Sequence, residues 1–367
     1  MNDDVLTFGI EEEFFVVDRD GRLSQTGDAV VDAADEEEGE LQQELTRSQA
    51  ESATGICTTH DEAEHQLTTL RAELARSAAH RGCRLLPSGC APLSETALPA
   101  ITPNPRYERM AEHFGATART SHTCGCHVHI AIPDRETGIR VINHIRPFLP
   151  ALLTVTANSA ICDGYDTGYA SWRYQQWNRW PSAGSPPLFA SLDHYDGIVD
   201  AWLRAGAILD RAMVYWDVRL SEKQPTVEFR FADVAATPGE AVLLGVLIRG
   251  LVGTILASEG RPADLSNEVL RAQIWRASRE GVSGRCPHFR TGDLAPASDV
   301  LDDVVTFAAG ALDETGDLDF VRDGYARLVA GGSGADRQRA RFEKRRRAED
   351  VVDLLAGRPG FRRSPAG

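Results

Sequence analysis

Residues 5–17 read VLTFGIEEEFFVV, a run of β-branched and aromatic residues that encloses three consecutive glutamates. This composition predicts a β-strand. Side chains alternate along a strand, so Glu11 and Glu13 share one face while Glu12 falls on the other. Neighbouring like charges destabilise a strand unless something offsets them, and a divalent cation bound by carboxylate oxygens does so. A solvated edge strand is the alternative that needs no ligand.

A second strand is predicted at residues 121–132, which contain the sequence CGCHVH at Cys124–His129. The motif suggests zinc, but cysteines and histidines that point to opposite faces of a strand cannot share one ion. We therefore expect the thiols in the core and His127 and His129 in a site. A pair of hydrogen-bonded structural histidines is the alternative.

A third strand is predicted at Thr226–Asp233, TVEFRFAD, where apolar and polar residues alternate. The alternation places the apolar side chains on the core face and Glu228 and Arg230 together on the opposite face. A metal-binding glutamate beside an arginine that binds phosphate or carboxylate fits this pattern. An ordinary surface ion pair fits it as well.

Two further features carry weaker signals. Glu44 and Glu51 stand seven residues apart, which is one face of a helix but opposite faces of a straight strand, so both enter one site only if a turn or bulge separates them. Residues 163–187, rich in glycine, proline and aromatic residues, predict a long loop that contains Arg173 and either covers a substrate or packs on itself. Acids on neighbouring strands imply cations, and cations beside arginines imply phosphate.

The order of the predicted elements favours an α+β fold, because strands and helices do not alternate as β-α-β units. We expect an antiparallel sheet backed by helices, in a single catalytic domain over residues 1–367. The predicted helices cover residues 60–81, 104–114, 137–160 (interrupted by Pro147 and Pro150), 237–258 and a series over 264–357, and further strands are predicted at 83–87 and 214–220.

Local signals mark where some of these elements begin. Asn104-Pro105 predicts a helix cap followed by proline at the first helical position. Thr237-Pro238-Gly239-Glu240 predicts a reciprocal cap, and the helix after it is apolar nearly all round, as in a buried core helix. The acidic run Asp35–Glu38 falls in a predicted loop.

The composition narrows the classes of function. A formal net charge of −15 argues against nucleic acid or an anionic membrane as the partner. There is no G-x-x-x-x-G-K-[ST] and no G-x-G-x-x-G, so arginines and metal must hold any nucleotide phosphates. Seven scattered cysteines and the lack of a secretory signal pattern favour a reduced, cytoplasmic protein with small-molecule partners. A homo-oligomer is compatible with the sequence.

The chain resembles the carboxylate–amine ligases related to glutamate–cysteine ligase, in particular the bacterial type 2 branch. The resemblance runs from about residue 5 to residue 355 and rests on motifs in the same order. They are FGIEEEF at Phe8–Phe14, CGxHVH at Cys124–His129, LPALL through DGYDTGYASWR at Leu149–Arg173, WDVR at Trp216–Arg219, TVEFRFAD at Thr226–Asp233 and ADRQR at Ala335–Arg339.

This resemblance implies a fold similar to the catalytic domain of glutamine synthetase, in which a curved antiparallel sheet forms a funnel backed by helices. It implies ATP and Mg²⁺ as cofactors. Arg230 and Arg173 are the candidate catalytic groups, and Arg230, His127 and His129 are the candidates for binding the cofactor. The implied metal ligands are Glu11, Glu13, Glu44, Glu51 and Glu228.

We therefore expect an ATP-dependent ligase that joins glutamate to cysteine through an acyl phosphate and yields γ-glutamylcysteine. The same chemistry on a different acid and amine stays open, because many relatives carry Gly-Thr-His-Pro where this chain reads Gly89-Cys90-Ala91-Pro92. A metal-dependent amide hydrolase that uses His127 and His129 stays open too, as does a non-catalytic nucleotide sensor.

Overall fold

The computed structural model describes residues 6–34, 39–93 and 97–357; the acidic run at Asp35–Glu38, predicted as loop, lies outside them. Within these residues the main sheet has seven strands, in the order β2-β3-β1-β5-β9-β8, with β4 paired to β1. Every pairing in this sheet is antiparallel, which confirms the predicted α+β class. The strands are β1 (Phe8–Val17), β2 (Glu40–Gln43), β3 (Gln49–Ala53), β4 (Arg84–Leu86), β5 (Gly125–Ala131), β8 (Val218–Leu220) and β9 (Thr226–Asp233).

The glutamate-rich strand β1 lies in the middle of the sheet, hydrogen-bonded to β3, β4 and β5. Its alternation follows the prediction. Glu12 is fully buried on the helix side, where Arg71 of α2 (His60–His80) donates to its two carboxylate oxygens at 2.8 and 2.5 Å. A buried carboxylate needs such a partner, so Glu12 serves the fold.

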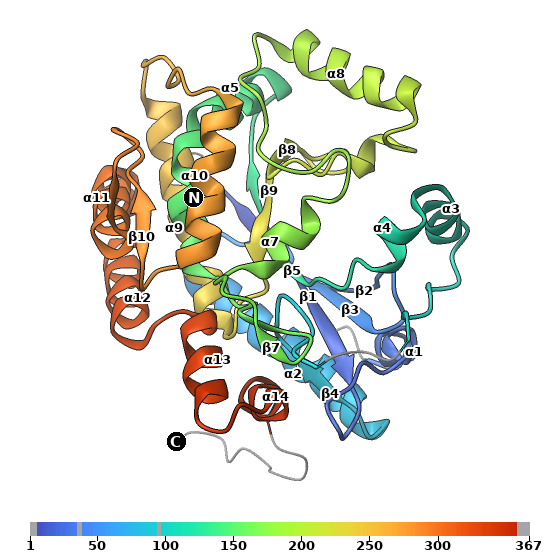
Figure 1. Cartoon of the computed structure of the whole chain (residues 1–367). Helices are drawn as coiled ribbons and strands as arrows, with labels where there is room; N and C mark the ends of the chain where they lie inside the picture. The colour runs from blue at the N-terminus through green and yellow to red at the C-terminus, as the bar shows by residue number, and fades with distance from the viewer. Residues whose placement is uncertain (1–5, 35–38, 94–96, 358–367) are drawn as a thin grey trace.

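Helix α9 (Pro238–Ala257) forms the centre of the helical layer, and Figure 1 shows it among α10, α11 and α12 on one side of the molecule. Thr237 caps the helix by accepting a hydrogen bond from the Glu240 N–H at 3.4 Å. The predicted reciprocal cap is incomplete, because the Glu240 carboxylate pairs with Arg337 at 2.6 Å instead. By length and composition α9 is apolar enough to cross a membrane, but most of it is buried inside the protein, as in a core helix.

The helices predicted at 60–81 and 104–114 are present, but α1, α4 and α8 lie outside the predicted helices, and the predicted series over 264–357 is interrupted by the strand pair β10–β11. The region 137–160 divides near its prolines into α5, the 3₁₀ turn η1 and α6, and the predicted loop 163–187 contains a short strand and a short helix. The other elements are α1 (Gly27–Asp32), α3 (Pro105–Phe114), α4 (Ala116–Arg119), α5 (Arg135–Ile145), η1 (Arg146–Phe148), α6 (Leu149–Val155), β6 (Ile161–Cys162), β7 (Tyr165–Asp166), α7 (Trp172–Trp177), α8 (Leu192–Ala205), η2 (Arg211–Met213), α10 (Asn267–Glu280), β10 (Arg285–Pro287), β11 (Leu294–Pro296), α11 (Ala297–Glu314), α12 (Leu318–Gly331), α13 (Gly334–Glu343) and α14 (Ala348–Ala356).

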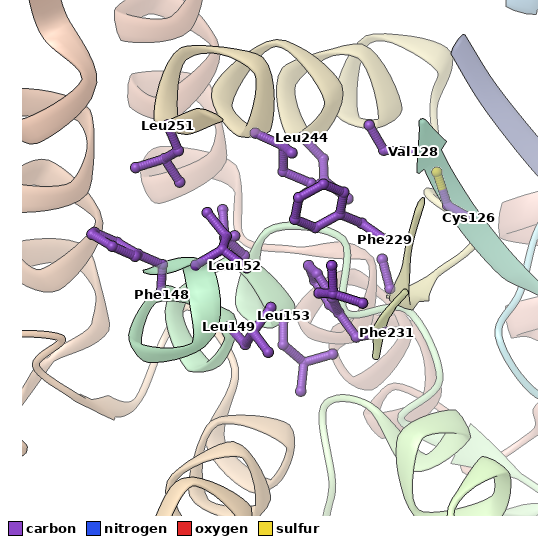
Figure 2. Packing of buried hydrophobic residues seen from close by; sticks show 14 of the residues in the cluster. Cys126, Val128, Phe148, Leu149, Leu152, Leu153, Phe229, Phe231, Leu244 and Leu251 are labelled. Atoms are coloured by element: carbon purple, nitrogen blue, oxygen red, sulfur yellow. The ribbon is translucent and has the colours of Figure 1, made fainter. Parts of the chain in front are cut away.

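The main core fills the space between the sheet and the helical layer. Cys126 and Val128 of β5 and Phe229 and Phe231 of β9 are buried there, together with leucines of α6 and α9 (Figure 2). All seven cysteines are buried and unpaired, so the thiols face the interior as predicted. Because side chains alternate, the intervening residues of β1, β5 and β9 face the other side of the sheet.

Candidate functional site

A cavity of about 740 Å³ lies on the face of the sheet that points away from α9. Strands β1, β3, β5 and β9 form its floor, and residues of α3, α7 and the β8–β9 turn contribute to its walls. A cavity of this size is typical of sites for small molecules and cofactors. Except for Arg173, the structure brings all of the predicted site residues to this cavity: Glu11, Glu13, Glu44, Glu51, His127, His129, Glu228 and Arg230.

One group of candidate metal ligands joins Glu11, His129 and Glu228, whose ligand atoms lie within 4.8 Å of one another. His129 Nε2 is 3.2 Å from Glu11 Oε1, and its Nδ1 is 2.9 Å from the Thr226 hydroxyl. Burial acts to raise the pKa of Glu11, but hydrogen bonds from His127 and His129 outweigh it and hold that pKa well below its usual range. Burial also opposes the charged form of His129, yet the hydrogen bond to Glu11 and the charge of Glu228 raise its pKa overall.

A second group consists of Glu13, Glu44 and Glu51, whose ligand atoms also lie within 4.8 Å of one another. Glu51 stands directly opposite Glu13 in the β1–β3 register, and Glu44 belongs to the turn between β2 and β3. The turn that the seven-residue spacing required is therefore present. Burial, followed by the charge of Glu44, raises the pKa of Glu51 well above its usual range. Carboxylates held this close together favour a bound cation.

Glu228 is held by two arginines. Arg219 of β8 lies opposite it in the sheet and donates to both carboxylate oxygens, from Nε at 2.9 Å and from Nη2 at 3.2 Å. Arg230 Nη1 pairs with the same carboxylate. Burial acts to raise the pKa of Glu228, but the charges of Arg219 and Arg230 hold it well below its usual range. Sequence reasoning missed Arg219, because its pairing with Glu228 depends on the strand order, which the WDVR motif alone does not reveal.

His127 lies between the two acidic groups. Its Nδ1 is 3.1 Å from Glu11 Oε2 and 3.5 Å from Arg230 Nη1, and its Nε2 is 3.7 Å from Glu13 Oε1. Burial, followed by the charge of Arg230, lowers the pKa of His127. The ring is therefore neutral near pH 7, and a neutral imidazole nitrogen can act as a ligand.

Arg173 does not reach the cavity, which departs from the predicted catalytic position. It belongs to α7, it is 1% exposed, and its guanidinium donates to the backbone carbonyls of Arg230 and Phe231 at 3.2 to 3.4 Å. The guanidinium also packs over the Trp177 ring, with 5.6 Å from its carbon to the ring centroid. In this structure the guanidinium of Arg173 therefore contacts backbone beside the cavity and does not line the cavity itself.

An aromatic wall lies along one side of the cavity, and two of its members, Trp177 and Trp180, come from the aromatic-rich segment 163–187 that the sequence singled out. The other two members, which sequence reasoning missed, come from distant segments; they are Tyr107 and Tyr215. Cys90, where the chain departs from its relatives, does not line the cavity. It is buried beside Cys162, and the burial raises the pKa of its thiol well above the usual range.

Solved structures share this architecture. A bifunctional glutathione synthetase from Pasteurella multocida matches with a TM-score of 0.68 at 14% identity, over 96% of this chain and 52% of that one, so this chain spans about half of that protein. A glutamate–cysteine ligase from Francisella tularensis, solved in complex with AMP, matches with a TM-score of 0.65 at 12% identity, over 95% of this chain and 87% of that one. The fold is that of the glutamine synthetase-like ligases.

Sequence comparison narrows this class. The model of glutamate–cysteine ligase family 2 matches residues 7–355. A protein of Rhodococcus jostii named "Putative glutamate–cysteine ligase 2-1" is 47% identical over 95% of both chains. A protein of Saccharopolyspora erythraea with the same name is 44% identical over 95% of this chain and 93% of that one. The chain belongs to glutamate–cysteine ligase family 2 and is an ATP-dependent ligase that acts on small molecules.

Proposed function

We propose that this protein joins glutamate to cysteine with ATP, through an acyl phosphate, and releases γ-glutamylcysteine. The observation that carries the proposal is the pair of ligand groups, Glu11–His129–Glu228 and Glu13–Glu44–Glu51, on the floor of one cavity beside Arg230. The names of the relatives support the choice of glutamate and cysteine.

The donor atoms of both groups suit divalent cations, and we propose Mg²⁺. Glu13, Glu44 and Glu51 offer only oxygen, the donor that Mg²⁺ prefers, and burial together with their mutual repulsion raises the pKa of Glu51. Glu13, Glu44 and Glu51 would hold the ion, and a bound Mg²⁺ would supply positive charge against the ATP phosphates.

The side chain of Arg230 would also offset negative charge on the phosphates. Burial opposes the charge of Arg230, but the neighbouring Glu228 raises its pKa overall, so Arg230 stays charged beside the cavity. It would stabilise the phosphoryl group as it moves from ATP to the substrate carboxylate with release of ADP. It would then stabilise the tetrahedral intermediate that forms when the amine attacks the acyl carbon and that collapses as phosphate leaves. Neutral His127, beside both acidic groups, would contribute a nitrogen ligand.

Two further expectations belong to this proposal. We place the enzyme in the reducing cytoplasm, because its seven thiols are buried and unpaired. We also treat the chain as a single catalytic domain, since one hydrophobic cluster runs from Phe8 in the first strand to Leu328 in α12.

The test measures phosphate release from ATP with Mg²⁺ and glutamate, with and without cysteine, and the mass of the product. We expect cysteine-dependent release and γ-glutamylcysteine. Glu228→Gln should lower kcat by about 10²-fold or more, in the range seen when an electrostatic stabiliser of a transition state is lost. Glu222→Gln is the matched control, since Glu222 lines the same cavity but pairs with the partly exposed Arg211.

Phosphate release with a different amine or acid, but not with glutamate and cysteine, would contradict the substrate pair and keep the ligase chemistry. Amide hydrolysis that needs no ATP would contradict the ligase chemistry itself and favour a hydrolase. Full activity in Glu228→Gln would remove Glu228 from the metal site.

A further inference from the structure

Strand β9 contains a β-bulge at the edge of the site. Along β5 and β9, Cys126 pairs with Ala232 but Val128 pairs with Phe229, so Arg230 and Phe231 together oppose the single residue His127. A bulge bends the strand, disrupts the ladder and redirects the side chains beside it. This bulge lies where Arg230 enters the cavity next to His127.

The guanidinium of Arg173 binds the carbonyls of this bulge. Its Nη1 donates to Phe231 O at 3.2 Å and to Arg230 O at 3.4 Å, and its Nη2 donates to Arg230 O at 3.3 Å. A planar guanidinium can donate to two carbonyls at once, which a point-like ammonium does poorly. Arg173 is thus bound to the backbone of the residue whose side chain carries charge into the site.

Gly125 makes room for this contact. A Cβ at Gly125 would overlap the Arg173 guanidinium, with Nη2 as its nearest atom. The backbone N–H of Gly125 in turn donates to Glu13 Oε2 at 2.6 Å. Arg173 therefore packs directly against the peptide that holds one of the cavity carboxylates, and its other neighbour, Trp177, belongs to the cavity wall.

A buried polar cluster fixes Arg173 in turn. The Arg173 N–H donates to the Ser159 hydroxyl at 3.0 Å. The Asp233 carboxylate accepts from that hydroxyl and from the Ser171 hydroxyl, each at 2.7 Å, and from the Asn158 N–H at 2.8 Å. All of these groups are buried. The loop before α7 is thereby bonded to the end of β9, and the backbone of Arg173 is held beside the bulge.

We infer that Arg173 is a positioning residue, which locks the β9 bulge and the Gly125 peptide so that Arg230 and Glu13 point into the cavity. It acts through the backbone and touches neither substrate nor cation. The inference rests on the proposed function only for its kinetic readout, because cation binding reports the same geometry without any turnover.

The test compares Arg173→Ala with Arg146→Ala in the full chain. Arg146 is a matched control, because it is 1% exposed and donates to the carbonyls of Pro186 and Leu265 at 3.0 and 2.7 Å, but it does not line the cavity. Mn²⁺ binding, followed by electron paramagnetic resonance of the free ion, and kcat with saturating substrates are measured per folded molecule.

For Arg173→Ala we expect Mn²⁺ affinity to fall about 10-fold or more, as when the outer support of a metal site is lost. We expect kcat to fall about 10²-fold, as for a small misplacement of catalytic groups. Guanidinium ion at low millimolar concentration should restore part of the Mn²⁺ affinity and part of kcat, because it can fill the space that the Arg173 side chain leaves. Arg146→Ala should unfold more easily and keep both values.

Unchanged Mn²⁺ affinity with a raised KM for the acid substrate would overturn the inference, because Arg173 would then bind substrate directly. Equal losses in Arg146→Ala would overturn it too, since they would report general destabilisation. If wild type turns over no substrate, the proposed function fails, while weakened Mn²⁺ binding in Arg173→Ala still supports the inference. If Arg173→Ala does not fold, Arg173→Lys takes its place, and wild-type values in that variant overturn the inference.

Discussion

Among single residues, neighbouring glutamates of β1 perform different tasks. Glu13→Gln removes a carboxylate from the cavity, and we expect kcat to fall about 10²-fold or more with little change in stability. Glu12→Gln changes the adjacent residue on the opposite face, where Arg71 would keep a buried charge without its partner. That variant should lose about 3 kcal/mol of unfolding free energy and keep its kcat per folded molecule.

Urea unfolding and steady-state kinetics on both variants check this contrast. The control is wild type at matched fractions of folded protein. If Glu12→Gln lost activity as strongly as Glu13→Gln at equal folded fraction, the assignment of the two faces to core and site would be wrong.

Arg219 provides a second prediction for a single residue. It donates to both carboxylate oxygens of Glu228, so Arg219→Lys keeps the positive charge but loses the bidentate hydrogen bond. We expect about a 10-fold loss of kcat for Arg219→Lys and a larger loss for Arg219→Ala, because Glu228 would turn away from its position. Steady-state kinetics over a Mg²⁺ titration measure this. Equal activity of Arg219→Lys and wild type at all Mg²⁺ concentrations would show that Glu228 needs no second arginine.

The sequence alone predicted the site residues that strand alternation places on one face of a strand. It missed the residues that reach the site only through strand order or through contacts between distant segments. The pattern in TVEFRFAD predicts Glu228 and Arg230 on one face, as the structure has them. Nothing in that strand predicts the bulge at Arg230 and Phe231, because the bulge is a register shift against β5 and its carbonyls are bound by the distant Arg173. Arg219, Tyr107 and Tyr215 were missed for the same reason, since their places at the site depend on contacts between distant segments.

Between neighbouring elements, the junction of β8 and α7 contains a titratable group. Asp217, just before β8, is 2% exposed and accepts a hydrogen bond from the Tyr174 hydroxyl of α7 at 2.9 Å. Burial raises the pKa of Asp217 to about 7, although the hydrogen bond and Arg173 act in the other direction. Between about pH 4 and pH 7 the folded chain therefore holds a proton that the unfolded chain has lost.

The contribution of Asp217 to the free energy of unfolding is fully present below about pH 4 and is lost as the pH rises to about 7. Over this interval the unfolded chain releases its Asp217 proton more readily than the folded chain does, so rising pH favours unfolding. With about 1.4 kcal/mol per pH unit, the loss amounts to at most about 4 kcal/mol. We expect the unfolding free energy of Asp217→Asn, relative to wild type, to rise over this interval and level off above it. Urea unfolding from pH 5 to pH 8 measures the difference, and a flat difference would contradict a raised pKa.

The ends of helices show where the local sequence is enough to predict the structure. Asn104 caps α3 by accepting from the Arg106 N–H at 2.8 Å, with Pro105 as the first helical residue, as predicted. Helix α7 escaped prediction although Ser171 caps it, because six residues are too few to display a helical period. Prolines signalled the division of the 137–160 region, and the structure places η1 there.

Across the molecule as a whole, the antiparallel sheet and its helical layer were predictable from the order of elements, but the links between distant parts were not. One such link is a buried ion pair between Arg249 of α9 and Asp317, at the start of α12. Arg249 also donates to Thr58 O at 2.5 Å, and His60 Nδ1 lies 2.8 Å from Asp317 Oδ1. The group thus joins α2, α9 and α12 beneath β1, whose Phe8 ring lies under the Arg249 guanidinium.

The Arg249–Asp317 ion pair should contribute to the stability of the fold and take no part in the catalysed reaction. Asp317→Leu leaves the guanidinium of Arg249, which is 2% exposed, without its carboxylate, so we expect a loss of about 3 to 5 kcal/mol of unfolding free energy. Adding Arg249→Met removes the stranded charge and should recover most of that loss, because burial of two apolar side chains avoids the desolvation of two charges. Chemical unfolding of the single and double variants measures the recovery, with kcat expected to equal the wild-type value per folded molecule. A double variant less stable than Asp317→Leu would mean that the hydrogen bonds of Arg249 to Thr58 and its stacking on Phe8 outweigh the cost of burying an unpaired charge.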